Sequence, residues 1–229
     1  MPSNLPDIIR NFERVPAHVV AQAAEFQPAI LADVAGRRGA VHGRIKALRP
    51  RMKLAGSAIT VEVRPGDNLM IHAAIAMARP GDVLVIDGKG DQGSALMGTI
   101  MMTACKQLGI AGVVMDGACR DSLEIDEMDF PVFSVGTNPN GPTKLASGRI
   151  GHPVSVGGVA VRAGDLVIGD ADGVVVVERE KVETLLQVAA KKVEDEAARI
   201  EAIKNGNTAA KWLNTALRNA GVLSGNETL

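Results

Sequence analysis

Apolar residues form two short continuous runs in the middle of the chain, at 82–87 and 110–116. Runs of this length that are rich in Val, Leu and Ile predict strands buried on both faces of a sheet. Between them, residues 94–109 carry apolar side chains at helical spacing, which predicts a helix with Ser94 as its N-cap. Residues 88–93 are predicted to form a loop. A strand, a helix and a second strand in this order predict a βαβ unit with parallel strands.

The pattern changes after residue 121, where helices no longer alternate with strands and short apolar runs are separated by Gly and Asp turns. The elements predicted outside the βαβ unit are helices at 16–25, 66–82, 181–204 and 208–222, and strands at 56–63, 130–135, 152–156, 158–170 and 173–179. Together they predict an α/β fold with mixed sheets and a long C-terminal helix, organised as one domain.

The amino-acid composition indicates which kinds of binding partner to expect. The chain has 229 residues, 46% of them apolar, which is enough for a sizeable core. It carries 25 basic and 26 acidic side chains without a basic arm, and only 2% of its residues are aromatic, so neither nucleic acid nor a membrane surface is an expected partner. Two cysteines, no signal-peptide pattern and no apolar run of about 20 residues lead us to expect a cytoplasmic protein.

The sequence "DGACRD" at 116–121 places a fixed cation beside a fixed anion directly after an apolar strand. Ligands in parallel sheets bind beyond the carboxyl ends of the strands. A helix start nearby offers unpaired N–H groups, and Arg120 adds a bidentate fork for a carboxylate or phosphate. Asp121 could hold a hard divalent cation through oxygen. This combination is the minimum needed to polarise a 2-oxo acid.

Two other interpretations of these residues stay open at this point. The Arg120–Asp121 pair is often no more than a local turn or a surface ion pair. Gly88, Gly90 and Gly93 spell G-x-G-x-x-G between a predicted strand and a predicted helix, with an acid ending the next strand at Asp116, which is the dinucleotide-binding pattern. Only one βαβ unit is visible, whereas a full dinucleotide site needs more of them.

Three side chains near these segments are given structural interpretations. His72 lies in the apolar helix and is expected to be a hydrogen-bonded structural histidine, and Asn68 is expected to cap or orient a turn at the start of that helix. Cys119 is closer to the candidate site and is considered as a reactive thiol, although the sequence shows nothing that would lower its pKa.

Three segments together resemble the RraA-like family: "GDNLMIHAAIAMARPGDVLVIDGKG", "SALMGTIMMTACKQLGIAGVVMDGACRD" and "VRAGDLVIGDADGVVVVERE". Its members include aldolases for 4-hydroxy-4-methyl-2-oxoglutarate and 4-carboxy-4-hydroxy-2-oxoadipate, and regulators of ribonuclease E activity. The resemblance covers about residues 15–200 and implies a swivelling β/β/α architecture. It also implies a single domain over 1–229, with a helical extension at 205–229, that assembles into trimers or hexamers.

The resemblance implies a role for each candidate site residue. Arg120 would bind the carboxylate of a pyruvyl unit, and Asp121 would bind Mg²⁺ or Mn²⁺, largely through water. The segment whose backbone amides bind substrate corresponds to Gly98, Thr99, Ile100 and Met101, which moves the expected helix start to near Gly98. A glutamate from a neighbouring subunit would complete the site; Glu196 matches best and Glu201 second.

One position departs from the family pattern. The aldolases carry an acidic residue separated by twenty residues from the arginine of the pair, and this position is Thr99 here. A hydroxyl cannot replace a carboxylate in holding a water that acts as a base, so aldol cleavage should suffer more than decarboxylation. Asp91, in the predicted glycine loop, is a hypothetical substitute.

The resemblance implies a divalent-metal-dependent lyase. It would cleave substrates of the 4-hydroxy-4-methyl-2-oxoglutarate type to pyruvate, and it would decarboxylate oxaloacetate through the same pyruvate enolate. The alternative is a non-catalytic regulator that binds a ribonuclease E-like partner, and a third possibility is activity on an unrelated carboxylate.

Overall fold

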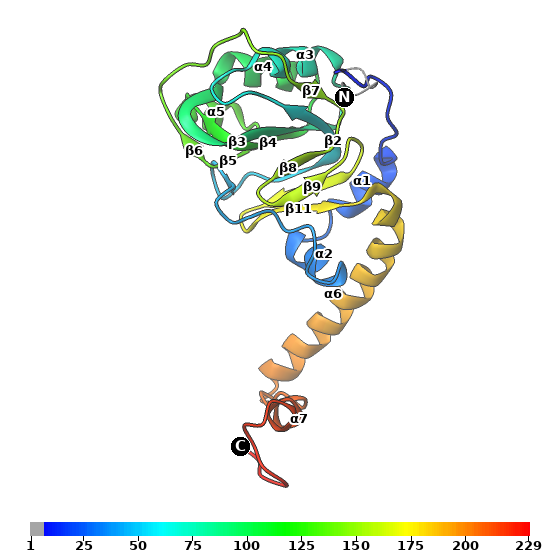
Figure 1. Cartoon of the computed structure of the whole chain (residues 1–229). Coiled ribbons are helices and arrows are strands. Elements are labelled where there is room, and N and C mark those ends of the chain that lie inside the picture. The colour runs from blue at the N-terminus through cyan, green and yellow to red at the C-terminus, as the bar shows by residue number, and fades with distance from the viewer. Residues whose placement is uncertain (1–6) are drawn as a thin grey trace, which may run out of the picture. The chain divides into compact units, whose positions relative to one another are not determined.

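A computed structural model describes residues 7–229 of the chain (Figure 1). The chain forms two compact units that divide between Ala189 and Ala190, within the longest helix. The first unit contains every strand. The second contains the end of that helix and one short helix.

The main sheet of the first unit is mixed and has the order β1-β5-β4-β3-β2-β10-β11. Its four central strands run parallel, whereas β10 pairs antiparallel with β2 and β11, and β1 pairs antiparallel with β5. The strands of this sheet are β1 (Lys46–Ala47), β2 (Leu54–Glu62), β3 (Asp82–Met97), β4 (Gly112–Cys119), β5 (Val132–Ser134), β10 (Leu166–Asp170) and β11 (Gly173–Val177), with β6 (Gly136–Thr137) beside β4 and β7 (Arg149–Ile150) beside β2. A separate hairpin joins β8 (Val154–Val156) to β9 (Val159–Val161).

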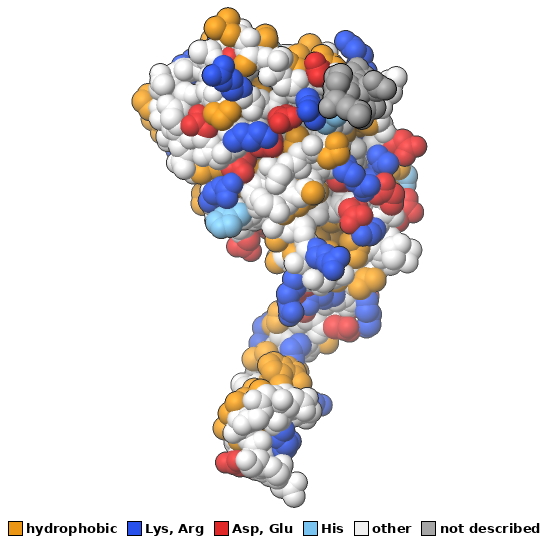
Figure 2. Space-filling model, viewed as in Figure 1, with side chains coloured by type: hydrophobic (Ala, Val, Ile, Leu, Met, Phe, Trp, Pro, Cys, Tyr) orange, Lys and Arg blue, Asp and Glu red, His pale blue; other side chains and the backbone are white. Residues whose placement is uncertain are grey.

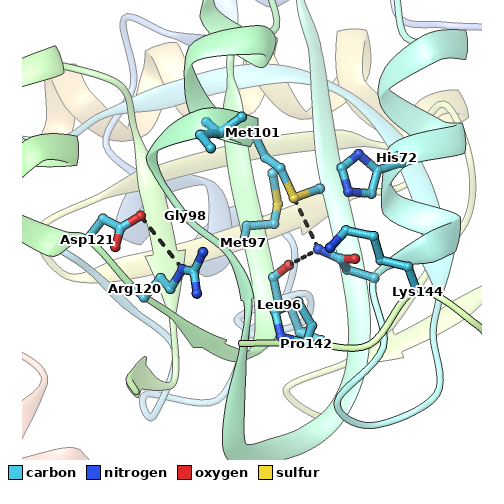
Figure 3. Close-up of a pocket in the computed structure, with 11 residues that line it drawn as sticks. His72, Leu96, Met97, Gly98, Met101, Arg120, Asp121, Pro142 and Lys144 are labelled. Carbon is cyan, nitrogen blue, oxygen red and sulfur yellow. Dashed lines mark hydrogen bonds and ion pairs between the residues drawn. The ribbon is translucent and has the colours of Figure 1, made fainter. Parts of the chain in front are cut away.

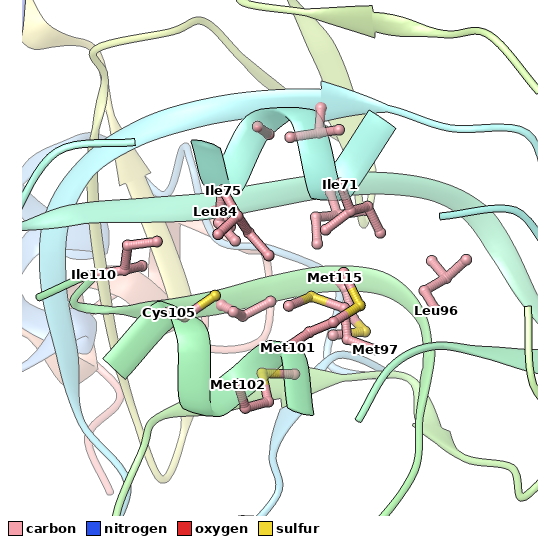
Figure 4. Close-up of a cluster of buried hydrophobic side chains, with 14 of the residues drawn as sticks. Ile71, Ile75, Leu84, Leu96, Met97, Met101, Met102, Cys105, Ile110 and Met115 are labelled. Atoms are coloured by element: carbon pink, nitrogen blue, oxygen red, sulfur yellow. The ribbon is translucent and has the colours of Figure 1, made fainter. Parts of the chain in front are cut away.

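Apolar side chains cover both faces of this sheet. On one face, α3 (Leu69–Met77), α4 (Thr99–Gln107) and α5 (Ser122–Met128) pack on the central strands, with Ile125 of α5 in the same cluster. Figure 4 shows Ile71 of α3 and Met102 of α4 in this cluster. On the other face, the β8–β9 hairpin packs on residues of β3, β4 and β5. Burying one such aliphatic side chain contributes about 1.5–3 kcal/mol, so the carboxyl ends of β3 and β4 are held by a rigid core.

A third apolar cluster joins β10 and β11 to the remaining helices of the first unit. These are α1 (Ala17–Ala23), α2 (Pro28–Val34) and the first residues of α6 (Val182–Lys204), which a short 3₁₀ turn, η1 (Arg179–Lys181), precedes. Pro28 occupies the first position of α2, where its missing N–H costs nothing.

The second unit consists of α6 from Ala190 onward and α7 (Leu213–Asn219). The Arg199 guanidinium donates to the carbonyl oxygens of Asn207, Thr208 and Ala209, which fixes the turn after α6. No helix within residues 7–229 is long and apolar enough to cross a membrane. On the face of the first unit shown in Figure 2, basic and acidic side chains are interspersed.

The predicted βαβ unit is confirmed, because β3 and β4 are parallel neighbours. The loop predicted at 88–93 is wrong. Strand β3 continues through it to Met97, with shifts of register against β4 that lie between Ile86 and Met97. The extension is paired with β4 and held from its other side by a loop, where the Ala95 N–H donates to the Asn140 carbonyl.

The helix predicted to start at Ser94 begins five residues later. Ser94 is buried inside β3 and caps nothing, and α4 starts at Thr99 with Gly98 as the N-cap residue, where the family resemblance placed it. Helices α2 and α5 were not predicted, and α7 is shorter than the predicted helix at 208–222.

The dinucleotide interpretation is wrong as well. Gly88, Gly90 and Gly93 lie inside β3, and no helix follows them directly. A Cβ atom at Gly88 would come within 2.7 Å of the Asp116 carbonyl oxygen, so this glycine permits close packing against β4. Asp116 lies in the middle of β4, where its carboxylate accepts hydrogen bonds from Arg44 and from the Gly157 N–H.

Candidate active site

A small cavity lies beyond the carboxyl ends of β3 and β4 (Figure 3). Its volume is about 130 Å³, well below the roughly 300–1,000 Å³ of pockets for drug-sized ligands. The lining residues are Asn68, His72, Leu96, Met97, Gly98, Ile100, Met101, Arg120, Asp121, Pro142 and Lys144. The cavity is therefore suited to a molecule of a few carbon atoms.

Gly98 joins β3 to α4 and brings the two parts of the site together. Its backbone is extended, so no positive φ requires a glycine here. The requirement is space, since a Cβ atom at this position would lie 2.4 Å from Asp121 Oδ2 and 2.9 Å from Arg120 Cγ. Only glycine allows the Arg120–Asp121 pair to approach the start of α4 this closely.

Arg120 and Asp121 follow β4 directly and are fixed by the backbone at the end of β3 and at the start of α4. The Arg120 N–H donates to the Met97 carbonyl at 3.0 Å, and the Thr99 N–H donates to Asp121 Oδ2 at 2.9 Å. The Arg120 Nε atom lies 3.8 Å from the same carboxylate oxygen. The Arg120 side chain remains 41% exposed, so its guanidinium is free to meet an anion from the cavity.

Asp121 adopts a left-handed backbone conformation, with φ 61° and ψ 43°. Aspartate tolerates this region better than most residues, yet it still costs on the order of 1 kcal/mol. The conformation turns the chain from β4 into α5 within two residues, which holds the carboxylate at the start of α4. Strain of this kind is often found at functional sites.

The first turn of α4 faces the cavity through Ile100 and Met101, whose N–H groups the helix itself does not use. The Thr99 N–H donates to Asp121 Oδ2 in this structure. The Thr99 hydroxyl is buried and makes no hydrogen bond with the described residues. Whether the amides at 98–101 bind substrate remains a prediction.

The opposite wall contains residues to which the sequence assigned structural roles. The Asn68 side chain does not cap α3; its Nδ2 donates to the Leu96 carbonyl at 2.9 Å and lies 3.2 Å from Met101 Sδ. His72 was expected to be structural, yet it lines the cavity with an exposed side chain. Lys144 comes from the loop after β6 and was not considered, because no local pattern marks it.

Asp67 holds the loop that carries Lys144. Its Oδ2 accepts hydrogen bonds from the Thr143 hydroxyl at 2.6 Å and from the backbone N–H groups of Leu145 and Ala146 at 2.7 and 3.1 Å. Burial by itself would raise the pKa of Asp67, but the bonds from Leu145, Thr143, Leu69 and Ala146 outweigh it and lower the pKa to about 2. The carboxylate is thus ionised and clamps the loop on both sides of Lys144.

The donors in the cavity fit a water-rich divalent cation site. Among residues 7–229, no group of three or more His, Cys, Asp or Glu side chains converges as a metal cage. The Thr99 N–H occupies Asp121 Oδ2, which leaves Oδ1 for another ligand. Mg²⁺ commonly retains several waters and binds through one or two carboxylates together with its substrate. A single carboxylate at the edge of a small cavity is compatible with this mode of Mg²⁺ binding.

Neither of the two acidic side chains considered for this site lines the cavity. Asp91 is on β3, where its Oδ1 accepts the Gly93 N–H, and it is not part of the cavity lining. Glu196 belongs to the second unit and forms an ion pair of 2.8 Å with Lys192. Its contribution from a neighbouring copy remains a prediction.

The structure argues against a reactive thiol at Cys119. Burial raises the pKa of Cys119, and its Sγ lies 3.6 Å from the hydroxyl of Ser134 inside the protein. Burial likewise raises the pKa of Cys105 to about 12. A thiolate at either position would be strongly disfavoured near neutral pH.

Comparisons with known proteins agree with the geometry. Residues 17–176 match the family model described as RraA-like, Aldolase/RraA. A protein of Halalkalibacterium halodurans with the provisional name 4-hydroxy-4-methyl-2-oxoglutarate aldolase is 45% identical over 161 residues, which cover 70% of this chain and 77% of that protein.

Solved structures show the same fold. Streptomyces coelicolor RraAS2, described as an unusual member of the RNase ES inhibitor RraA protein family, superposes with a TM-score of 0.75 at 28% identity, covering 82% of this chain and 99% of its own. An uncharacterised Pseudomonas syringae protein gives a TM-score of 0.76 at 25% identity, covering 86% and 97%. The matched segment 17–176 includes every residue of the cavity. The chain therefore belongs to the RraA-like (Aldolase/RraA) family.

Proposed function

We propose that this protein is a divalent-metal-dependent lyase that releases pyruvate from substrates of the 4-hydroxy-4-methyl-2-oxoglutarate type and also decarboxylates oxaloacetate. The observation that carries the proposal is the convergence of Arg120, Asp121 and the first turn of α4 on one small cavity. The name of the Halalkalibacterium halodurans relative supports an aldolase-type reaction.

Arg120 would bind the carboxylate of the 2-oxo acid. Its guanidinium presents parallel N–H donors that match a carboxylate, and the unused N–H groups of Ile100 and Met101 add donors from the positive end of α4. Because Gly98 lacks a side chain, these groups and Asp121 lie within the reach of one small molecule. Binding of this kind fixes the pyruvyl half before any bond breaks.

Asp121 would hold Mg²⁺ or Mn²⁺, which when bound supplies a Lewis acid for the negative charge that develops on the keto oxygen. The hydrogen bond from Thr99 and the constrained backbone of Asp121 keep the carboxylate in place for this task. Arg120, whose Nε lies 3.8 Å from Asp121 Oδ2, would balance the negative charge of the bound acid.

Both reactions break the bond between C3 and C4 and leave its electrons on the pyruvyl half as an enolate, which a proton then converts to pyruvate. In aldol cleavage the C4 hydroxyl also loses its proton, and the other half leaves as a carbonyl compound. In decarboxylation the other half leaves as CO₂, and no hydroxyl proton is involved. Thr99 cannot replace the acidic residue that holds a basic water in the aldolases. Its presence should therefore slow decarboxylation less than aldol cleavage.

A second candidate function is the binding of a ribonuclease E-like partner without catalysis. The structural similarity to RraAS2 favours considering it, because that protein is described within an RNase inhibitor family. The shared fold does not separate the two functions.

The test is pyruvate release measured by NADH oxidation with lactate dehydrogenase. The purified full chain would be given 4-hydroxy-4-methyl-2-oxoglutarate or oxaloacetate, with Mg²⁺ and then with EDTA, and the spontaneous decarboxylation would be subtracted. We expect EDTA-sensitive release that Asp121→Asn abolishes. The matched control Asp172→Asn changes an exposed carboxylate in the β10–β11 turn and should leave the rates unchanged. Absence of EDTA-sensitive release from both substrates would favour the binding role.

A further inference from the structure

We propose that Lys144, with His72 beside it, binds the second carboxylate of a 2-oxo diacid and makes the cavity selective for diacids over monoacids. This inference rests on the proposed function, because it concerns the other half of the same substrate. Four features of the cavity support it: two cationic ends, a clamped lysine, an unpaired buried acceptor and an apolar middle.

The cavity has cationic side chains at both ends. In Figure 3, Arg120 and Asp121 lie on one side of Gly98 and Met97, and His72 and Lys144 lie on the other. The lining holds two permanent cations, Arg120 and Lys144, against the single carboxylate of Asp121. A ligand with one carboxylate would leave one of the two cationic ends without a partner, whereas a diacid reaches both.

Lys144 is held in position by its neighbours although its side chain is exposed. The Asp67 carboxylate binds the hydroxyl of Thr143 before it and the N–H groups of Leu145 and Ala146 after it. Within residues 7–229, the Lys144 ammonium forms no ion pair. A fixed backbone beneath an unpaired ammonium lowers the entropy lost when an anion binds.

A buried acceptor on the same wall lacks a donor. Asn68 Oδ1 is shielded from solvent and makes no hydrogen bond with the described residues, while Nδ2 is fixed by the Leu96 carbonyl. The hydrogen bond from Nδ2 to the Leu96 carbonyl sets the orientation of the amide and leaves Oδ1 facing away from that partner. Leaving such an acceptor unpaired costs about 1–3 kcal/mol, and a ligand hydroxyl between two carboxylates is the kind of donor that would satisfy it.

Between the two ends the walls are apolar, formed by Leu96, Met97 and Met101. The cavity therefore presents a cation, a hydroxyl acceptor with hydrocarbon surface, and a second cation. That sequence of groups is complementary to a hydroxylated 2-oxo diacid of five or six carbon atoms.

The test compares two ligands that differ only at the distal end. Isothermal titration calorimetry of the full chain with Mg²⁺ would measure the dissociation constants of 2-oxoglutarate and of 2-oxopentanoate, in which a methyl group replaces the distal carboxylate. Neither has the C4 hydroxyl required for aldol cleavage, so binding is read without turnover. We expect the diacid to bind at least about tenfold more tightly, as a charge-assisted contact would provide.

Lys144→Gln should weaken 2-oxoglutarate binding by about tenfold and leave 2-oxopentanoate binding unchanged, while Lys144→Arg should retain most of the preference. Lys211→Gln, an exposed lysine in the second unit, is the matched control. Unchanged circular dichroism and thermal midpoints would show that the variants are folded.

Three results would overturn the inference: no preference for the diacid in the wild type, equal weakening of both ligands by Lys144→Gln, or binding of neither ligand. The pyruvate assay decides the proposed function separately. Pyruvate release together with an unchanged diacid preference in Lys144→Gln would reject only the role of Lys144. Selective diacid binding without pyruvate release would reject only the lyase.

Discussion

At the scale of single residues, the site depends on an absent side chain. Gly98 lets the Asp121 carboxylate accept the Thr99 N–H, and thereby sets where the Arg120 guanidinium lies. Asp121 contributes a left-handed backbone that turns the chain sharply after β4. Together, Gly98 and Asp121 bring the end of β4 within hydrogen-bonding distance of the start of α4.

Gly98→Ala should therefore impair the site far more than the fold. The added Cβ would overlap Asp121 Oδ2, so the pair must move away from the helix start. We expect kcat/KM for pyruvate release to fall about 100-fold and stability to fall by about 1–3 kcal/mol. Gly43→Ala, where a Cβ would have open space, is the control and should keep wild-type kinetics. Near-normal activity of Gly98→Ala would mean that the observed contact is not needed.

At the scale of secondary-structure elements, the loop between β6 and β7 becomes part of the site because Asp67 holds it. This buried carboxylate, just before α3, binds residues more than 70 positions later in the chain. The backbone of Thr143 is also bonded to Gly66 and Asn68, so the Asp67 carboxylate mainly fixes the residues that follow Lys144.

Asp67→Asn should destabilise the protein and alter its response to acid. An amide NH₂ group in place of Oδ2 would face the N–H donors of Leu145 and Ala146, which should cost roughly 1–3 kcal/mol. The pKa of Asp67 is lowered from 3.8 to about 2 in the folded protein. The ionised carboxylate therefore stabilises the fold fully above pH 3.8, and this stabilisation is lost as the pH falls from 3.8 to about 2.

Urea unfolding at pH 6, 4 and 3 would measure both effects. Wild-type stability should fall more steeply below pH 4 than that of Asp67→Asn, while the variant should be less stable at pH 6. Parallel pH profiles for the two proteins would show that Asp67 does not titrate as the structure indicates.

Periodicity predicted most elements, because strands and helices of the core follow local patterns. It failed at 88–97, where three glycines indicated a loop and a helix start. Strand β3 extends there through shifted pairing with β4 and through hydrogen bonds from the loop at 138–140. These contacts depend on distant parts of the chain, and no local signal contains them.

The candidate site divides in the same way. Arg120 and Asp121 could be found because they follow an apolar strand as an unexpected pair, and the family resemblance located Gly98. Lys144 and His72 could not, because only the folded loop and the start of α3 bring them to the same cavity. Residues that bind the variable half of a substrate are often on loops, where sequence patterns are weakest.

At the scale of the whole molecule, we expect a second copy of the chain to complete the site. The expected contribution of Glu196 comes from a neighbouring subunit in a trimer or hexamer, and Glu196 belongs to the second unit of this chain. An arrangement of that kind makes catalysis depend on assembly.

Mixed oligomers would test this arrangement. Arg120→Lys loses the guanidinium fork and Glu196→Gln loses the carboxylate, so each variant alone should be nearly inactive. Co-expressed with different tags and purified through both, they should regain about a quarter of wild-type activity, since a quarter of randomly mixed interfaces combine two intact residues. A complete site within one chain would give no recovery, and full activity of Glu196→Gln alone would exclude a role for Glu196.

The cavity wall has a consequence for how the protein unfolds. Its residues come from four separate stretches, at 68–72, 96–101, 120–121 and 142–144. A small acid that touches all of them ties together segments that only a completed sheet brings side by side. Occupancy then acts as a removable cross-link for the first unit, so that metabolite concentration would set the protein's resistance to heat and to proteases as well as its rate of turnover.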